Sequence, residues 1–178
     1  MKSKKYFLVG MPASGKSTIG KLLAGQLRLN FFDLDKIIVD KEKETITDIF
    51  IKKGEAYFRE LESTCLKEFI EKEDAFVLAT GGGAPCFFDN MKVMNMHGIT
   101  VFLDVEIMDL YNKLASKGTH KRPLLKGKSK KELKEELISK YEERKPFYNK
   151  SKICLDQRLD DVNHRVNQAI FAINTLEK

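Results

Sequence analysis

One short segment near the N-terminus limits what this chain can fold into more than any other feature. Residues 10–17 read GMPASGKS, which fits the pattern G-x-x-x-x-G-K-[S/T]. An apolar run precedes this segment and an amphipathic stretch follows it, which is the strand-loop-helix context of a phosphate-binding loop (P-loop). A glycine-rich turn without a ligand is the alternative interpretation, and these flanking elements disfavour it. The candidate nucleotide-binding residues are Gly10, Ala13, Ser14, Gly15, Lys16, Ser17 and Thr18.

The chemistry of such a loop indicates which ligands it takes. Its glycines let the backbone wrap around phosphate oxygens, and the amide groups at the start of the next helix point toward them. Lys16 is then placed to contact the β- and γ-phosphates, and the Ser17 hydroxyl to coordinate Mg²⁺. We therefore expect ATP and Mg²⁺ as cofactors.

The rest of the chain alternates short apolar runs with longer amphipathic stretches, a pattern typical of βαβ units. Strands are expected at residues 6–9, just before 33, and at 75–79, 99–103 and 152–155. Helices are expected at 16–29, 34–42, 47–53, 55–71, 88–97, 107–116, 129–141 and 160–176. The sequence thus predicts an α/β fold, a three-layer α/β/α sandwich with a five-stranded parallel sheet of the P-loop NTPase type. Its 178 residues suit one domain spanning 1–178.

Charge is concentrated in one segment. The chain has a formal net charge of +6, but residues 117–131 hold seven Lys or Arg and no Asp or Glu. The remainder carries 25 basic and 26 acidic residues. A nucleic-acid-binding module would use such a segment, yet no aromatic residue is interleaved there to stack on bases. We expect an exposed loop and no nucleic-acid partner.

Other features bear on location and partners. Cys65, Cys86 and Cys154 form no CxxC pair, which disfavours a disulfide framework or a zinc site and fits a reducing cytoplasm. No stretch reaches the roughly 18 to 20 apolar residues that span a bilayer, and the apolar run at 6–9 is too short for a signal peptide. We expect a soluble, cytoplasmic monomer without a membrane partner.

Two carboxylates, Asp33 and Asp35, follow the second expected strand. In an open α/β sheet, ligands bind where strands end, so these side chains are placed to serve a metal or a substrate hydroxyl. Capping the next helix is an equally good explanation of the pair taken alone. Glycines at 81–83 follow the third strand and permit close approach of a ligand, whereas a plain flexible turn is the alternative.

Arginines form the other candidate group. Arg59 and Glu62 lie three residues apart on one expected helix, where a surface ion pair is the simpler explanation. Arg122 lies in the basic loop and Arg144 beyond it, and arginines on a movable segment can neutralise charge during phosphoryl transfer. A solvated charge run is the usual alternative for any one of them.

Together, these motifs resemble one family, the shikimate kinases of the nucleoside-monophosphate-kinase-like branch of P-loop proteins. The resemblance extends over about residues 7–148. It rests on the P-loop, the DLD at 33–35, the DIF at 48–50, the GEAYFRELE at 54–62, the GGG at 81–83, the RPLL at 122–125, and Arg144 before Pro146 and Tyr148. It implies transfer of the ATP γ-phosphate to shikimate, giving 3-phosphoshikimate in aromatic amino-acid biosynthesis.

The resemblance also implies roles on the nucleotide side. Lys16 would contact the phosphates, Ser17 and Asp33 would serve Mg²⁺, and Arg122 would close over both reactants with a mobile lid at about residues 113–128. Arg158 would lie in the adenine-side loop. The arginine expected before the lid, which would stack on adenine, has no clear equivalent.

On the acceptor side, the resemblance implies a substrate-binding helical segment at about 34–62. Asp35 would hold ring hydroxyls and accept the proton of the attacking one. The implied substrate-binding residues are Asp35, Phe50, Phe58, Arg59, Gly81, Gly82, Gly83, Arg122 and Arg144. The loop after the glycines, APC at 84–86, departs from the family pattern.

Three other functions are alternatives to phosphoryl transfer to shikimate. A related small-metabolite kinase acting on gluconate or a nucleoside monophosphate keeps the fold and changes the acceptor. Two arginines beside a carboxylate favour a compact polyhydroxylated acid. A nucleic-acid-binding P-loop module and a catalytically silent nucleotide-binding regulator are weaker, the latter because Lys16, Ser17, Asp33 and Arg122 are all present.

Overall fold

The central feature of the computed structural model, which describes residues 4–117, 129–156 and 161–177, is a parallel sheet of five strands. The strands run in the order β2-β3-β1-β4-β5. They are β1 (Lys4–Val9), β2 (Asn30–Asp33), β3 (Ala75–Ala79), β4 (Ile99–Asp104) and β5 (Ile153–Asp156). Every predicted strand is present, so the predicted five-stranded parallel sheet is confirmed.

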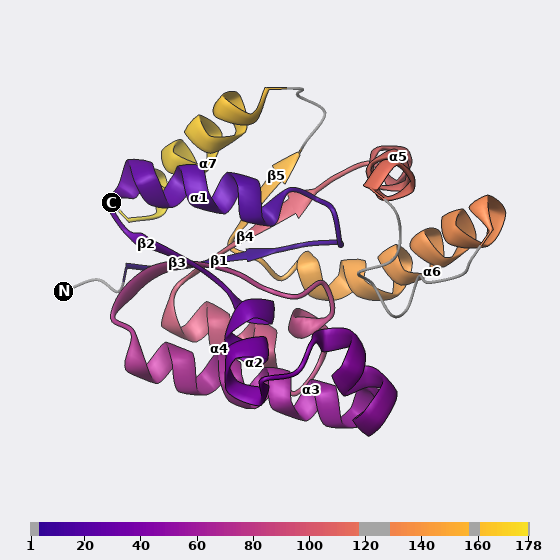
Figure 1. The fold of residues 1–178 in the computed structure, drawn as a ribbon. Coiled ribbons are helices and arrows are strands. Elements are labelled where there is room, and N and C mark those ends of the chain that lie inside the picture. The colour runs from indigo at the N-terminus through magenta and orange to yellow at the C-terminus, as the bar shows by residue number, and fades with distance from the viewer. Residues whose placement is uncertain (1–3, 118–128, 157–160, 178) are drawn as a thin grey trace.

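Helices cover both faces of this sheet (Figure 1). α1 (Lys16–Leu27) and α7 (Val162–Leu176) lie side by side on one face. α2 (Leu34–Glu42), α3 (Ile46–Lys72) and α4 (Asn90–His97) lie on the other, while α5 (Ile107–Lys117) packs against α6 (Lys130–Tyr148). A short 3₁₀ turn, η1 (Ala84–Cys86), follows β3. The predicted three-layer α/β/α sandwich is therefore confirmed.

Alternation along β1 explains the two layers of core. Side chains on a strand point to opposite faces in turn. Phe7 and Val9 belong to a cluster formed with α3, α4, α5 and α6, whereas Tyr6 and Leu8 belong to a second cluster formed with α1 and α7. All four side chains are buried, as expected for a parallel strand covered on both faces.

Several boundaries differ from the predicted ones. α6 continues past residue 141 to Tyr148 although it contains Pro146, because Arg144 and Tyr148 are buried and their packing stabilises the last turns. α4 begins at Asn90 instead of 88 because Phe88 and Asp89 adopt left-handed backbone angles. The predicted break between helices at 53 and 55 is confirmed as a kink within α3.

The sheet places three loops at one edge. The loops after β1, β2 and β3 all leave from the carboxyl ends of neighbouring strands, which is where open α/β sheets bind ligands. The chain passes to β3 on one side of β1 and to β4 on the other, so the loop after β1 lies at the switch point of the topology. In the part of the chain that is described, no helix is both long and apolar enough to cross a membrane.

Candidate active site

The loop after β1 adopts a conformation that requires its glycines. Gly10 has φ 139° and Gly15 has φ 97°, angles that residues with a Cβ rarely adopt. A Cβ on Gly10 would also lie 2.8 Å from the carbonyl oxygen of Leu103. The loop thus curves tightly over the end of β4 and leads directly into α1.

Lys16 is the first residue of α1 and folds back over this loop. Its Nζ donates to the carbonyl oxygens of Gly10 and Met11, at 2.8 Å each. Among the described residues, no side chain caps the start of α1, and its first turn holds no acidic residue. The positive end of the helix dipole is therefore open to an anion, with a lysine ammonium beside it.

The second loop brings two carboxylates toward the P-loop. Ser17 Oγ donates to Asp33 Oδ2 at 3.0 Å, and the Asp35 backbone N–H donates to Asp33 Oδ1 at 3.2 Å. Asp33 therefore caps α2, which confirms the capping interpretation for this residue, and it also orients Ser17. A hydroxyl and a carboxylate held together beside a phosphate site are oxygen ligands of the kind that Mg²⁺ takes in phosphoryl-transfer enzymes. These residues fit the implied metal.

A cavity of about 230 Å³ joins the three loops. It is lined by Pro12, Ala13, Gly15, Lys16, Ser17, Thr18, Asp33, Asp35, Thr80, Gly81 and Gly82. The structure thus brings together five of the seven predicted P-loop residues, both carboxylates and two of the three predicted glycines, whereas Gly10 and Ser14 do not line this cavity. Pro12 and Thr80 were missed because neither residue type carries a recognisable signal for phosphate or hydroxyl binding.

The glycine triplet lies directly against the charged side chains. A Cβ on Gly81 would lie 2.5 Å from Glu62 Oε1 and 3.2 Å from Asp35 Oδ1. A Cβ on Gly82 would lie 3.2 Å from an Arg144 guanidinium nitrogen. These contacts show why the segment is more than a flexible turn: its backbone fills the space between the carboxylates and the arginines.

Arg59 lies at the centre of this arrangement. Only 5% of it is exposed, and it donates to Glu62 Oε2 at 2.8 Å and to Glu55 Oε1 at 3.0 Å. The expectation of a surface ion pair with Glu62 is therefore wrong, because Glu62 is 1% exposed. Spacing of three residues on a helix predicts that Arg59 and Glu62 are in contact. It does not predict that this face of the helix is buried.

Aromatic rings enclose the same guanidinium. The rings of Phe58 and Phe87 lie 5.2 Å and 4.7 Å from Arg59 Cζ, and the ring of Phe50 packs on Phe58 at 4.5 Å between centroids. Phe50 and Phe58 were predicted and Phe87 was not. Cation–π contact with desolvated rings favours the charged guanidinium and holds its plane in place.

Glu62 is the most perturbed carboxyl group of the site. Burial raises its pKa to about 7, and the neighbouring Arg59 and Arg144 guanidinium groups oppose that shift. Oε2 accepts from Arg59, whereas Oε1 has no hydrogen-bond partner among the described residues. Oε1 is buried against Gly81, which itself lines the cavity.

Arg144 enters the site from α6. It is 6% exposed, and Tyr148 one turn later donates its hydroxyl to the Gly82 carbonyl oxygen. Burial raises the pKa of Tyr148, so its hydroxyl stays protonated as a donor. Tyr148 was noted only as part of the family pattern, and its link to Gly82 explains how α6 is fastened to the glycine triplet.

Some predicted site residues lie outside the described residues. These are Arg122 and Arg158, together with residues 118–128 of the predicted lid. The remaining lid positions, 113–117, form the last turns of α5. Positions 113–116 therefore lie within the helix predicted at 107–116, and α5 extends one residue further to Lys117.

A family model and a curated relative indicate the same family. A family model described as "Shikimate kinase" matches residues 12–174. The chain is 45% identical over 153 residues to a shikimate kinase of Parabacteroides distasonis, covering 86% of this chain and 87% of that protein.

Solved structures give the same result. The crystal structure of shikimate kinase from Bacteroides thetaiotaomicron has a TM-score of 0.87 and 39% identity, covering 98% of each chain. Shikimate kinase from Acinetobacter baumannii, solved in complex with shikimate, has a TM-score of 0.88 and 28% identity, covering 97% of this chain and 94% of that one. The family model covers nearly all of the sequence, so this chain belongs to the shikimate kinase family.

Proposed function

We propose that this chain transfers the γ-phosphate of ATP to a ring hydroxyl of shikimate, giving ADP and 3-phosphoshikimate. One observation carries the proposal most strongly. Two buried arginines, Arg59 and Arg144, converge on the glycine triplet at the edge of a cavity that also contains Asp35 and the P-loop. Planar guanidinium groups bind carboxylates in a bidentate manner, so a hydroxylated ring acid fits between them and Asp35.

In this proposal the chain works mostly by positioning. The acceptor hydroxyl oxygen forms a bond to the γ-phosphorus, the bond between that phosphorus and the bridging oxygen breaks, and the electron pair leaves with ADP. Asp35 orients the hydroxyl and accepts its proton, while Lys16 and the amide groups of the P-loop stabilise charge on the phosphates. Ser17 and Asp33 would hold Mg²⁺, which neutralises phosphate charge when bound.

The remaining roles extend this scheme. Phe50 and Phe58 form the wall behind Arg59, and the Gly82 backbone grips the substrate carboxylate together with the arginines. Arg122 acts from a lid at about 113–128 that excludes water from the reaction, and Arg158 serves the adenine side. The whole chain acts as one kinase domain, with residues 34–62 as the acceptor-binding segment.

The setting follows from the reaction. A kinase that uses ATP and feeds aromatic amino-acid synthesis works in the cytoplasm, where both substrates are made. We propose a monomer that needs no nucleic-acid or membrane partner. Among the described residues, both arginines and Asp35 of the acceptor side come from one chain, so a second copy is not required to supply them.

ADP release from the purified protein with ATP and Mg²⁺ tests the proposal. Shikimate, gluconate, nucleoside monophosphates, single-stranded nucleic acid and no acceptor are compared at one ATP concentration. Strong stimulation by shikimate alone is expected. Equal stimulation by gluconate would favour the broader small-metabolite kinase, and stimulation by nucleic acid alone would overturn the acceptor assignment.

A further inference from the structure

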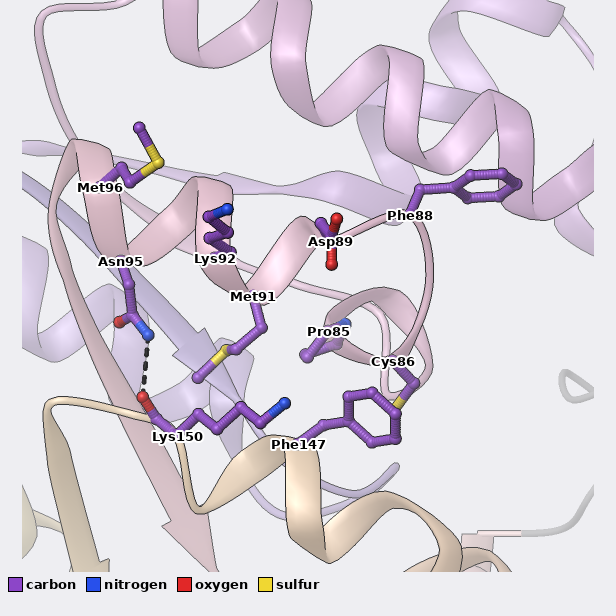
Figure 2. A pocket seen from close by; sticks show the side chains of 10 residues that line it. All are labelled: Pro85, Cys86, Phe88, Asp89, Met91, Lys92, Asn95, Met96, Phe147 and Lys150. Atoms are coloured by element: carbon purple, nitrogen blue, oxygen red, sulfur yellow. Dashed lines mark hydrogen bonds between the residues drawn. The ribbon is translucent and has the colours of Figure 1, made fainter.

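A second cavity lies outside the active site and is larger than it. Its volume is about 580 Å³, within the range of sites that hold small organic ligands. Its walls are η1 with the loop after it, α4, and the C-terminal end of α6 (Figure 2). The ten lining residues are Pro85, Cys86, Phe88, Asp89, Met91, Lys92, Asn95, Met96, Phe147 and Lys150.

The lining combines apolar surface with a net positive charge. Phe147, Met91 and Met96 supply an aromatic ring and two thioethers, groups that favour contact with an aromatic ligand. Lys92 and Lys150 contribute two positive charges and Asp89 one negative charge. The pocket is therefore complementary to a monoanion with a flat apolar body.

Lys150 is placed to receive the anionic group. Its Nζ lies 5.2 Å from the Phe147 ring centroid, a cation–π contact that directs the ammonium along the pocket. Figure 2 shows this side chain extending toward Phe147, with Asp89 on the opposite wall. The Asn95 side chain donates to the Lys150 carbonyl oxygen at 2.8 Å, which fixes the backbone of that residue against α4.

The opposite wall carries unusual backbone geometry. Phe88 and Asp89 are consecutive non-glycine residues with φ of 50° and 57°, a conformation that is costly for side chains of this kind. Phe88 borders the cavity and is 51% exposed, and its ring points away from the other labelled side chains (Figure 2).

We propose that this pocket is a binding site for a small aromatic carboxylate, distinct from the phosphoryl-transfer site. The ligand's ring lies among Phe147, Met91 and Pro85, and its carboxylate pairs with the Lys150 ammonium. The inference concerns binding only and does not rest on which acceptor the enzyme phosphorylates.

Titration calorimetry of the full chain with 2-naphthoate tests this site, with the neutral analogue 2-naphthamide as the matched ligand. Naphthoate is expected to bind more tightly than naphthamide. Lys150→Glu should weaken naphthoate binding by roughly tenfold and leave naphthamide binding almost unchanged, because only the charge pair is reversed. Lys21→Glu is the matched control, since Lys21 is an exposed lysine of α1 on the other face of the sheet.

Three outcomes would overturn the proposal: no binding of naphthoate, equal binding of the two ligands, or equal loss in both variants. Shikimate provides a further check. If the apparent dissociation constant of naphthoate rises in proportion to the shikimate concentration and does not level off, the two ligands compete for the active site. The proposal of a second binding site would then be wrong. The melting temperature of each variant confirms that Lys150→Glu remains folded, and failure here leaves the ADP-release result unaffected.

Discussion

The proposed nucleotide side of the active site comes from one run of residues, 10–18, whereas the proposed acceptor side draws on segments far apart in the sequence. Asp35 lies in the first turn of α2, Arg59 and Glu62 lie in α3, the glycines follow β3, and Arg144 lies in α6. The first region depends on local backbone geometry. The second depends on helices being packed so that buried charges meet across the glycine triplet.

This difference predicts how each side responds to mutation. A substitution of Lys16 removes the group proposed to contact phosphate without disturbing packing, since Lys16 is only partly buried. A substitution of Arg59 or Glu62 leaves a buried charge without its partner, which costs stability as well as binding. Changes on the nucleotide side should thus lower turnover and leave stability unchanged. Changes to the buried pair on the acceptor side should lower both shikimate binding and protein stability.

Lys16→Ala should have the largest effect on activity. Loss of the ammonium beside the phosphates is expected to lower kcat roughly a thousandfold, because charge developing in the transition state is no longer stabilised. The melting temperature should change little. Near-normal turnover in the purified, folded variant would contradict the assignment of the P-loop.

Asp35→Asn tests the boundary between the two sides. We expect kcat to fall roughly a hundredfold, because the amide cannot accept the hydroxyl proton. ATP binding should be retained, since Ser17 donates to Asp33, which this substitution leaves in place. Calorimetric titration with ATP measures this directly, and complete loss of ATP binding would show that the two sides are not separable at this residue.

Gly83→Ala probes the acceptor side through a single methyl group. The added Cβ would lie 2.6 to 2.7 Å from the Arg59 guanidinium atoms, so the arginine must move away from its position. The KM for shikimate is expected to rise roughly tenfold while the KM for ATP stays within about twofold. Gly25→Ala is the matched control, because no atom lies within 4 Å of its added Cβ and alanine favours the helix.

If both glycine variants behaved alike, the close contact of Gly83 with Arg59 would have no functional weight. A parallel rise in both KM values would instead mean that the glycine triplet holds the P-loop cavity as a whole. Either result would contradict the proposal that the nucleotide and acceptor sides respond separately to mutation.

The same division separates what the sequence could predict from what it could not. The strands, most helices and the P-loop were predictable because each depends on local periodicity or a contiguous motif. The family pattern supplied Arg59 and Arg144, but the burial of the Arg59–Glu62 pair requires α3, the glycine triplet and α6 to be packed together. No local signal indicated the left-handed pair Phe88 and Asp89, or the second cavity that it borders.

The pH dependence of stability that Glu62 confers should be the smallest of the predicted effects. Burial raises the pKa of this carboxyl from its ordinary value of 4.5 to about 7, so folding favours the protonated form. Its contribution to stability is fully present below pH 4.5 and is lost as the pH rises through about 7. The free energy of unfolding of the wild type should therefore decrease between pH 5 and pH 8 more than that of Glu62→Gln, which keeps an acceptor for Arg59 but cannot ionise.

Substrate binding should follow the same group. A shikimate carboxylate beside Arg59 adds negative charge near Glu62 and favours its protonation, so binding near pH 7 should take up protons. The KM for shikimate is expected to rise about threefold from pH 6 to pH 8 in the wild type and to stay nearly constant in Glu62→Gln. Calorimetry in two buffers with different ionisation enthalpies measures the proton uptake. If the uptake persisted in the variant, Glu62 would not be the titrating group, and the buried carboxyl would serve only to hold Arg59.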